Sequence, residues 1–338
     1  MKKILVTGGL GYIGSHTVVE LQKTGFEVVI IDDLSNSSKE VLSRITSITG
    51  IKPDFEEIDL KNKQAVEQFF KNYSIDGVIH FAASKAVGES VNEPLKYYEN
   101  NITTLTYVLK EMIANKVANF IFSSSCTVYG QADELPITEN APTKPAESPY
   151  GATKKMGEII IEDTTKVTAL KAIALRYFNA CGADDQVRHG QLKAATHVIA
   201  RIMETIVNKG VFTLNGTEYP TPDGTCVRDY LHVADIAEAH YLATLFGGGT
   251  EKGNSYELNL GTGKGISINE IIASVERITG RTVLVHKGPG RPGDPATLVS
   301  YPDKAKKTIG WTPRHSSIDN IVKTAWAWYN SAEYKGRA

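Results

Sequence analysis

The sequence VTGGLGYIG, residues 6–14, is the strongest indication of the fold, because glycines in it join a short apolar run to a helical pattern. The run KILVT (3–7) is typical of a buried strand, and the apolar periodicity after the glycines is typical of a helix. Glycines at this junction allow a tight turn and let backbone amides approach a pyrophosphate at the start of the helix. The alternative is a purely structural turn. The stretch therefore predicts a dinucleotide site built on Gly8, Gly11 and Gly14.

Outward from this turn, the first half of the chain alternates strand and helix patterns. Such alternation predicts an α/β fold with a doubly wound, parallel Rossmann-type sheet. After about residue 180 the pattern becomes richer in loops, so we expect a dinucleotide-binding domain at 1–180 and a smaller α/β substrate-binding domain at 181–338, with some chain crossing back. The expected strands are 3–7, 27–32, 54–58, 77–81, 119–124, 171–178, 211–214, 255–259 and 282–286. The expected helices are 12–24, 62–73, 94–116, 149–167, 196–209, 233–246, 268–279, 302–308 and 317–330.

The second expected strand ends in a pair of aspartates that bears on the choice of cofactor. Asp32 ends the strand that follows the glycine turn and its helix. A carboxylate at that position can bind both hydroxyls of an adenosine ribose, and it would repel a 2′-phosphate. The alternative is a surface aspartate. The position of Asp32 favours NAD over NADP.

Composition and charge narrow the class of protein without naming an activity. The 338 residues carry a formal net charge of −1, which gives no signal for nucleic-acid or membrane binding. The three cysteines are far apart, and the eight histidines show no metal-ligand spacing, so we expect no metal site and no disulfide framework. The start of the chain does not resemble a signal peptide, and no apolar run is long enough to cross a bilayer as a helix. We therefore expect a cytoplasmic protein.

The stretch SPYGATKK, residues 148–155, places Tyr150 four residues before Lys154. On a helix this spacing puts both side chains on one face. A free tyrosine has a pKa of about 10, and a nearby ammonium favours the phenolate, which is a base. The alternative is an exposed helical pair without a catalytic role, because this spacing often arises by chance.

The glycine spacing G-x-x-G-x-x-G and the Tyr-x-x-x-Lys pair together resemble the extended branch of the short-chain dehydrogenase/reductase superfamily. In that superfamily the tyrosine and lysine are catalytic, and a serine or threonine at a characteristic distance upstream completes the set. Here Ser125, in FSSSCTVYG (122–130), stands at that distance before Tyr150. The resemblance implies that Lys154 holds the nicotinamide ribose, Tyr150 removes a proton from a sugar hydroxyl, and Ser125 hydrogen-bonds the same oxygen.

The two residues that directly follow Ser125, Cys126 and Thr127, bear on which reaction follows the oxidation of the sugar. In nucleotide-sugar 4,6-dehydratases of this branch, the residues aligned with Cys126 and Thr127 are an Asp–Glu pair, and decarboxylases keep the glutamate. Without those carboxylates, the simplest fate of a 4-keto sugar is return of hydride from the other face. The resemblance therefore implies 4-epimerisation without net redox change. We expect Cys126 to be a small packed residue and not a nucleophile.

Five further stretches resemble the UDP-glucose 4-epimerases of this branch, and the resemblance covers nearly the whole chain. They are HFAASKAVGES (80–90), YYENN (97–101), RYFNACGA (176–183), YPTPDGTCVRDYLHV (219–233) and RPGDPA (291–296). The resemblance implies interconversion of UDP-galactose and UDP-glucose with tightly bound NAD. The implied cofactor contacts are Gly8, Gly11, Tyr12, Ile13, Gly14, Asp32, Asp33, Leu34, Asn36, Ser37, Asp59, Leu60, Phe81, Ala82, Ala83, Lys85, Asn100, Ser123, Tyr150, Lys154 and Phe178. The implied UDP-sugar contacts are Lys85, Ser125, Tyr150, Asn179, His197, Val198, Arg228, Arg291, Asp294 and Leu298.

Elementary chemistry supports part of the sugar set, and structural alternatives stay open for each member. An arginine suits a diphosphate because its planar fork gives bidentate hydrogen bonds, but Arg228 and Arg291 also fit surface ion pairs. Asn179 also fits a strand-end cap, and Asp294 fits a turn before a proline. Phe178, His197 and Leu298 also fit ordinary packing.

The chain departs from the resembled pattern in the loop 184–195, where Arg188, His189 and Lys193 stand at positions that are acidic in many relatives, and at His197, where asparagine is frequent. These departures concern the sugar that is accepted, so an epimerase acting on UDP-N-acetylglucosamine or a UDP-pentose stays open. A nucleotide-sugar reductase or dehydrogenase and a non-catalytic NAD-sensing protein stay open as well. The helices expected at 94–116 and 149–167 suggest a homodimer through a four-helix interface, although apolar faces also serve the core.

Overall fold

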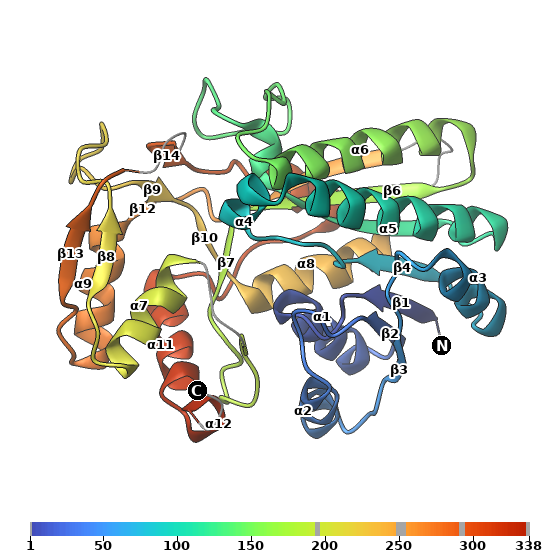
Figure 1. Ribbon diagram of the computed structural model, residues 1–338, viewed down its shortest axis with the longest axis horizontal. Coiled ribbons are helices and arrows are strands. Elements are labelled where there is room, and N and C mark those ends of the chain that lie inside the picture. Colours follow the sequence, from blue (N-terminus) through green and yellow to red (C-terminus); the bar gives the residue numbers. More distant parts are fainter. Residues whose placement is uncertain (1, 193–196, 248–254, 291–294, 336–338) are drawn as a thin grey trace.

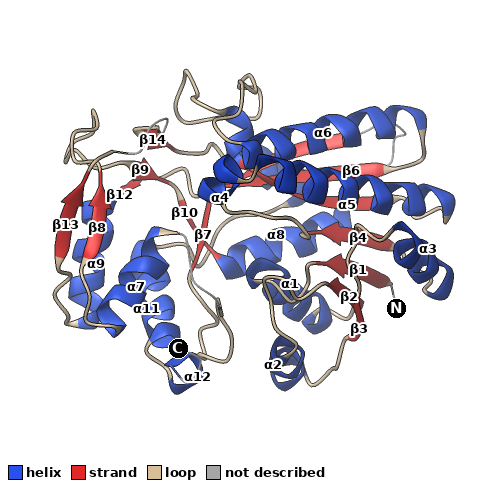
Figure 2. Ribbon diagram, viewed as in Figure 1, coloured by secondary structure: helices blue, strands red, loops and turns tan. Residues whose placement is uncertain are grey.

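A central parallel sheet organises the molecule in the computed structural model, which describes residues 2–192, 197–247, 255–290 and 295–335. Figures 1 and 2 show this sheet between two layers of helices. All of its strand pairs are parallel, which confirms the doubly wound Rossmann-type sheet predicted from the sequence. The spatial order of its seven strands is β11 (Ser255–Leu260), β6 (Lys171–Tyr177), β5 (Asn119–Ser125), β4 (Gly77–His80), β1 (Lys3–Thr7), β2 (Glu27–Asp32) and β3 (Asp54–Glu57).

Side chains alternate across each strand, so the sheet has an apolar core on both faces. On β1, Ile4 and Val6 belong to one core cluster and Leu5 to the other. The first cluster takes side chains from α1 (Tyr12–Lys23), α2 (Glu40–Thr49), α8 (Val233–Phe246) and α10 (Asp303–Ile309). The second takes them from α3 (Lys63–Asn72), α5 (Pro94–Ala114) and α6 (Pro149–Val167), and the short helix α4 (Val87–Asn92) contacts α5 and α6.

The strand order reverses between β1 and β4, and this reversal positions the candidate site. From β1 the chain continues to β2 and β3 on one side, and it then returns to β4 on the other side. In open α/β sheets, ligands bind beyond the carboxyl ends of the strands at such a point. The turn after β1 and the loop after β4 therefore meet where a cofactor is expected.

A second, smaller group of elements has a core of its own and lies to the left in Figure 1. Its helices are α7 (Val198–Val207), α9 (Ile268–Thr279), α11 (Ile318–Tyr329) and α12 (Ala332–Lys335), and its parallel strand pair is β8 (Phe212–Asn215) with β13 (Val285–Gly288). Short strands connect the two groups: β7 (Asn179–Cys181) pairs with β10 (Tyr230–His232), and β9 (Val227–Arg228) lies between β12 (Ile266–Ser267) and β14 (Thr297–Leu298).

Strand β11 is a segment of the second half that crosses back to the central sheet, as the sequence analysis allowed without saying which segment would do so. Its position in the chain groups it with the smaller part, but it pairs with β6 and forms an edge of the central sheet. Its place depends on pairing with a strand far earlier in the chain (Leu258 opposite Leu175), which no local pattern encodes. The division at residue 180 stays a prediction. Helices α2 and α4 and the two-residue strands were not expected, and β13 begins at Val285, three residues later than expected.

Within the described residues, none of the helices combines the length and the apolar character that a membrane-spanning segment requires.

Candidate functional site

The turn between β1 and α1 is compact because its glycines touch backbone. Gly8 has a φ of +67°, and a Cβ there would lie 2.8 Å from the amide nitrogen of Ala82. A Cβ on Gly14 would collide with the carbonyl oxygen of Gly8. Gly11 caps α1, and the amide of Ser15 donates to its carbonyl. The amides of Tyr12 and Ile13 precede this first helical bond, so they are suited to bind an anion at the helix N-terminus.

Asp32 ends β2 and is buried beside this turn. Its carboxylate accepts hydrogen bonds from the amides of Leu10 and Leu34, both at 3.0 Å, and from the hydroxyl of Ser37 at 2.6 Å. Burial raises the pKa of Asp32, and these hydrogen bonds oppose the rise. The bond to Leu34 holds that residue in the left-handed region, with φ at 62°.

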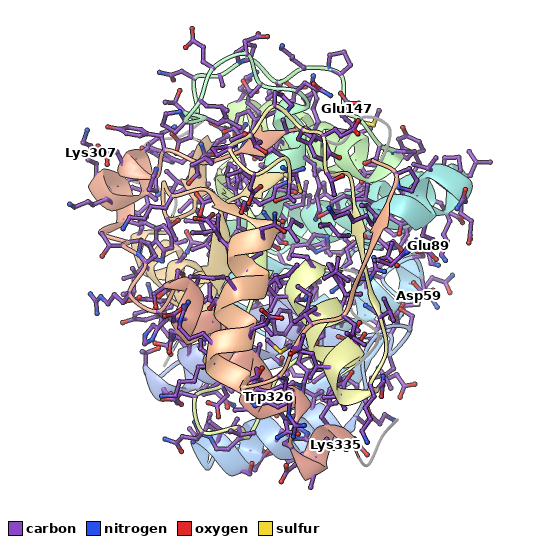
Figure 3. The ribbon with its side chains drawn as sticks, turned by 90° about the vertical axis from the view of Figure 1, so that its left-hand side faces the viewer. Asp59, Glu89, Glu147, Lys307, Trp326 and Lys335 are labelled. Atoms are coloured by element: carbon purple, nitrogen blue, oxygen red, sulfur yellow. The ribbon has the colours of Figure 1, made fainter. Side chains whose placement is uncertain are left out.

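The other residues expected around the adenosine lie on the adjoining loops. Asp33 and Asn36 are exposed, and Asp33 accepts hydrogen bonds from the amide and hydroxyl of Ser35. Leu60 is buried, whereas Asp59 is exposed and accepts from the amide of Lys61 at 2.9 Å. Figure 3 shows Asp59 near one edge of the molecule, with Lys307 at the opposite edge.

The loop after β4 lines the other side of the crevice. Phe81, Ala82 and Ala83 are partly buried, and the amide of Phe81 donates to Thr7. Lys85 is exposed as a whole residue, but loss of solvation around its ammonium lowers its pKa. Asn100 donates to the hydroxyl of Ser84 at 3.2 Å.

Helix α6 brings the tyrosine and lysine to the carboxyl end of β5. Ser148 caps the helix by accepting from the amide of Gly151 at 3.2 Å, and Pro149 follows, so Tyr150 stands in the first turn. Tyr150 shares a hydrogen bond with the side chain of Ser125. Lys154 donates to the carbonyl of Ser123 at 2.7 Å, and its Nζ lies 5.8 Å from the centre of the Tyr150 ring. The structure thus brings together the three residues that the sequence singled out.

The pKa of Tyr150 is set mainly by burial, which differs from our expectation that Lys154 would lower this pKa and favour the phenolate. Tyr150 is partly exposed, yet enough protein surrounds it that burial raises its pKa well above its ordinary value. Tyr177 also raises the pKa of Tyr150, and the hydrogen bond with Ser125 opposes the rise. Burial lowers the pKa of Lys154 to about 8. The protein alone therefore favours the neutral phenol, and an added positive charge near the ring is what would favour the phenolate.

Residues from three distant segments meet beside Ser125 on the side expected to bind the sugar. Cys126 and Phe178 belong to one apolar cluster, and Leu298, partly buried, packs against it. Burial raises the pKa of the Cys126 thiol to about 12, which agrees with a packed residue and not a nucleophile. Arg228 lies within electrostatic range of this thiol, and it donates to the carbonyl of Val227 at 2.8 Å.

Asn179 begins β7, where its side chain donates to the carbonyl of Asp229 at 3.0 Å. This contact is the strand-end role that the sequence left open. Arg291 and Asp294 lie outside the described residues, so their place is not assigned.

The unusual loop, as far as it is described (184–192), packs between α1 and α11. His189 shares a hydrogen bond of 2.6 Å with Ser15 of α1, and the carbonyl of Gln191 accepts from the indole of Trp328 at 2.8 Å. His197 precedes α7, contacts Gln191 at 2.6 Å and stacks on Tyr12, with 6.4 Å between ring centroids. Burial, with a contribution from Lys85, lowers the pKa of His197 to about 4, so this histidine is neutral at pH 7. Val198, the first residue of α7, is partly buried.

Several residues at the site were not singled out in the sequence. The hydroxyl of Tyr177 contacts that of Ser123, and burial raises its pKa to about 12. Buried Asn101 accepts from the amide of Ser84 at 2.8 Å and donates to Thr153 at 2.9 Å, so it joins the loop after β4 to α6. A polar residue at the carboxyl end of a strand was a usable signal for Tyr177. No local signal marks Asn101. Within the described parts of the chain, no group of acidic, histidine or cysteine side chains is arranged to hold a metal.

Comparison with known proteins identifies the family. The family model described as "NAD dependent epimerase/dehydratase family" matches residues 4–259. UDP-glucose 4-epimerase of Bacillus subtilis (strain 168) is 42% identical over 332 residues, covering 97% of each chain. The crystal structure of UDP-glucose 4-epimerase from Stenotrophomonas maltophila with bound NAD and formylated UDP-arabinopyranose has 39% identity and a TM-score of 0.93, covering 98% of each chain. That from Bifidobacterium longum in complex with NAD+ and UDP has 36% identity and a TM-score of 0.93, covering 98% of this chain and 99% of that one. This chain, as its glycine turn and Tyr-x-x-x-Lys pair predicted, belongs to the NAD-dependent epimerase/dehydratase family of extended short-chain dehydrogenases/reductases.

Proposed function

We propose that this protein is a UDP-glucose 4-epimerase, an NAD-dependent isomerase that interconverts UDP-galactose and UDP-glucose through a transient 4-keto sugar. The observation that carries the proposal is the arrangement of Tyr150, Ser125 and Lys154 at the carboxyl end of β5. Relatives that match 96–98% of this chain at about 40% identity carry this same activity in their names.

The residues around the β1–α1 turn fit NAD. The first amides of α1 are suited to the pyrophosphate, and the buried carboxylate of Asp32 suits a ribose with free hydroxyls. A 2′-phosphate there would meet a second negative charge. When bound, NAD would supply reversible hydride transfer at C4 of the sugar. Because the hydride taken from the sugar is returned to it, an epimerase needs no added nicotinamide.

The chain supplies the acid–base chemistry. The positive charge of bound NAD+ would favour the phenolate form of Tyr150. This phenolate takes the proton of the 4-hydroxyl, and Ser125 hydrogen-bonds the same oxygen and keeps it aligned. Lys154, anchored on the carbonyl of Ser123, places its ammonium beside the phenol ring. Reprotonation by Tyr150 after the sugar has turned in the site completes the epimerisation.

The residues after Ser125 favour epimerisation over elimination. Cys126 is buried with a raised pKa, and Thr127 carries no charge. A 4,6-dehydratase needs an acid and a base here to expel water from the sugar. This pair supplies neither, so the 4-keto sugar is reduced again.

For the UDP moiety we propose Arg228 as a diphosphate ligand, together with Arg291 and Asp294, which lie outside the described residues. Arg228 is buried near Cys126, so its guanidinium stands at the sugar side of the crevice. Asn179, His197 and Val198 complete this side in the proposal, and Leu298 lies against the sugar.

We also propose a cytoplasmic homodimer assembled through α5 and α6. Large apolar side chains are exposed along these helices, with Leu95 at 80% and Ile159 at 49%. Large apolar side chains exposed on two neighbouring helices are consistent with an interface. Light scattering tests this proposal: the wild type should have the mass of a dimer, and Leu95→Glu/Ile159→Glu should have the mass of a monomer. A monomeric wild type would refute the proposal. The three cysteines are buried and form no disulfide within the described residues, as suits a reducing compartment.

The decisive experiment is incubation of the purified protein with UDP-galactose, without added NAD, followed by chromatography for UDP-glucose. We expect the equilibrium mixture to form. A reductase or dehydrogenase would instead consume or release external nicotinamide in proportion to the sugar converted. Absence of UDP-glucose in the presence of retained NAD would refute the proposal.

A further inference from the structure

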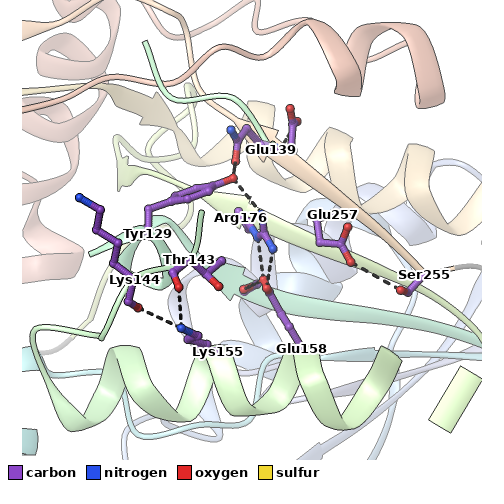
Figure 4. A network of polar contacts seen from close by, with 11 residues as sticks. Tyr129, Glu139, Thr143, Lys144, Lys155, Glu158, Arg176, Ser255 and Glu257 are labelled. Atoms are coloured by element: carbon purple, nitrogen blue, oxygen red, sulfur yellow. Dashed lines mark hydrogen bonds and ion pairs between the residues drawn. The ribbon is translucent and has the colours of Figure 1, made fainter. Parts of the chain in front are cut away.

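A buried ion pair lies directly behind the candidate catalytic residues. Glu158 stands on α6, one turn after Lys154, and its side chain is only 9% exposed. Arg176 of β6, at 6% exposure, binds it through two parallel hydrogen bonds: Nε to Oε1 at 2.9 Å and Nη2 to Oε2 at 2.6 Å. Figure 4 shows Arg176 between this carboxylate and Tyr129. A bidentate pair of this kind has one fixed geometry.

The carboxylate of Glu158 also binds the strand that carries the catalytic serine. Its Oε1 accepts a hydrogen bond from the hydroxyl of Ser124. Ser124 lies between Ser123, whose carbonyl holds Lys154, and Ser125, which is bonded to Tyr150. One carboxylate therefore joins α6 to Ser124, the middle one of three consecutive β5 residues, and the two outer ones contact Lys154 and Tyr150.

On its other side, Arg176 connects the pair to the segment after β5. Its Nη1 donates to the hydroxyl of Tyr129 at 2.9 Å, and Tyr129 donates to Asn259 of β11 at 2.6 Å. Tyr129 ends the 3₁₀ helix η1 (Cys126–Tyr129) that begins beside Ser125. The ion pair thus fixes β5, β6, β11 and α6 relative to one another around the site.

The negative charge of Glu158 also acts on Lys154, whose other neighbours are mostly uncharged. From β5 the ammonium faces the ring of Phe122, at 4.9 Å, and the carbonyl of Ser123. From β4 it faces His80, which burial keeps neutral with a pKa of about 3. Tyr150 is the neighbour on α6, and Tyr177 contacts Ser123 from β6. Burial lowers the pKa of Lys154, and Glu158 opposes that shift.

The outer side of the pair borders an open recess of about 440 Å³ between α6 and β11. The charged groups there have partners: Lys166 lies 2.9 Å from Glu162, and Lys155 donates to the carbonyl of Thr143 at 2.6 Å. Nothing in the recess therefore points to a ligand. We infer that the Glu158–Arg176 pair acts on the candidate catalytic residues on its inner side.

We propose that Glu158, held by Arg176, is a positioning residue for the epimerisation: it aligns Ser125 with Tyr150 through Ser124, and it keeps Lys154 charged. The inference rests on the function proposed above. It adds a residue that contacts neither cofactor nor sugar, and whose effect passes through Lys154 and Ser124.

Glu158→Gln tests the charge, because it keeps the shape of the side chain and removes the negative charge. With the NAD-loaded protein, kcat for UDP-galactose is measured across pH, and the titration of Lys154 is followed by NMR with isotope-labelled lysine. Without the carboxylate, Lys154 loses its proton at lower pH, so we expect the alkaline limb of kcat to move down by about one pH unit. The NMR midpoint of Lys154 should move in the same direction.

Glu162→Gln is the matched control, since it removes an exposed carboxylate one turn further along α6 and should change neither measurement. Glu158→Asp keeps the charge and should leave the alkaline limb in place. Ser124→Ala removes only the contact to β5, and it should lower kcat about tenfold or more at all pH values with KM nearly unchanged. The last two variants also decide the matter if Glu158→Gln does not fold.

Two results would overturn the inference: an equal loss of kcat at every pH in Glu158→Gln with an unmoved Lys154 midpoint, or a normal kcat in Ser124→Ala. The NMR midpoint separates this failure from a failure of the proposed function. If wild type does not epimerise UDP-galactose while the Lys154 midpoint still depends on Glu158, the activity assignment fails and the electrostatic role of Glu158 stands.

Discussion

Substitution of Tyr150 is the most direct test of the proposed acid–base chemistry. Tyr150→Phe removes the hydroxyl that Ser125 contacts and leaves the ring beside Lys154 in place. We expect kcat to fall by about a hundred- to ten-thousandfold, the typical size of a general acid–base contribution, while NAD stays bound. Tyr73→Phe is the control. Tyr73 caps the end of α3, and its hydroxyl donates a hydrogen bond to Glu56, so its loss should leave full activity. Near-normal turnover in Tyr150→Phe would show that another group is the base.

Arg228 is the described residue that the proposal assigns to the diphosphate. Arg228→Ala should raise KM for UDP-galactose about ten- to hundredfold, because a charge-assisted contact worth roughly 1.5–3 kcal/mol is lost. Calorimetric binding of UDP alone isolates the diphosphate from the sugar, and Arg201→Ala, on α7, serves as a charge control. Unchanged UDP binding in Arg228→Ala would remove this residue from the site. The same measurement on Arg291→Ala tests the second proposed ligand.

Leu298 bears on the range of sugars, since it packs beside Cys126 and Phe178 without being fully buried. A leucine leaves more room than a tyrosine and offers no hydrogen bond. We expect preference for UDP-galactose and UDP-glucose, with weaker turnover of UDP-N-acetylglucosamine. Leu298→Tyr should suppress the N-acetyl reaction and largely spare the hexose reaction, because a steric clash acts on the larger substrate.

Assays of both substrates with wild type and Leu298→Tyr decide the role of this residue, and Leu298→Met controls for repacking. Equal losses on both substrates would mean that Leu298 supports packing. No N-acetyl turnover in wild type would mean that another part of the pocket excludes that sugar.

At the scale of elements, the β1–α1 turn tolerates no side chain at Gly8 or Gly14, because a Cβ there would collide with backbone atoms. Gly14→Ala would place a methyl group against the carbonyl of Gly8. We expect NAD retention to fall at least about tenfold and the free energy of unfolding to drop by ~1–3 kcal/mol, the usual cost of overpacking. Heat-released NAD and urea unfolding measure the two effects.

Gly88→Ala in α4 is the matched control for this change, because a Cβ there meets no atom within 4 Å. It should retain NAD and be as stable as wild type or slightly more so. If Gly14→Ala retains NAD as well as Gly88→Ala does, the turn is not the pyrophosphate site.

At the scale of the whole molecule, buried histidines predict how stability depends on pH. Burial lowers the pKa of His80 and His232 to about 3 and that of His240 to about 4. The unfolded chain binds protons on these residues near pH 6.5, whereas the folded chain does not. Stability should therefore be lost as pH falls from about 6.5 toward 4, by about 1.4 kcal/mol per histidine for each pH unit in that range.

Urea unfolding at pH 7 and pH 5 checks this prediction. Replacing buried His240 with glutamine should reduce the difference between the two values, while replacing exposed His286 with glutamine should leave it unchanged. A free energy of unfolding that is the same at both pH values in wild type would contradict the assignment of neutral, buried histidines.

The central sheet and the candidate catalytic residues were predictable because they depend on short-range patterns. Residues 3–7 and 27–32 form strands with the bounds expected, since apolar runs flanked by turn residues specify buried parallel strands. Gly8 and Gly14 marked the turn, because only glycine fits the close backbone approach there. The four-residue spacing of Tyr150 and Lys154 placed them on one helical face.

How these parts act together depends on contacts between segments that are distant in the sequence. Strand β11 joins the main sheet by pairing with β6, and Glu158 of α6 meets Arg176 of β6 and Ser124 of β5. The same holds for the electrostatics: local spacing suggested that Lys154 would set the protonation of Tyr150, but burial by surrounding segments is the larger influence on both groups. Sequence spacing fixes which side chains share a face of one element. Desolvation and strand pairing depend on which distant segments enclose them, and only the folded chain determines that.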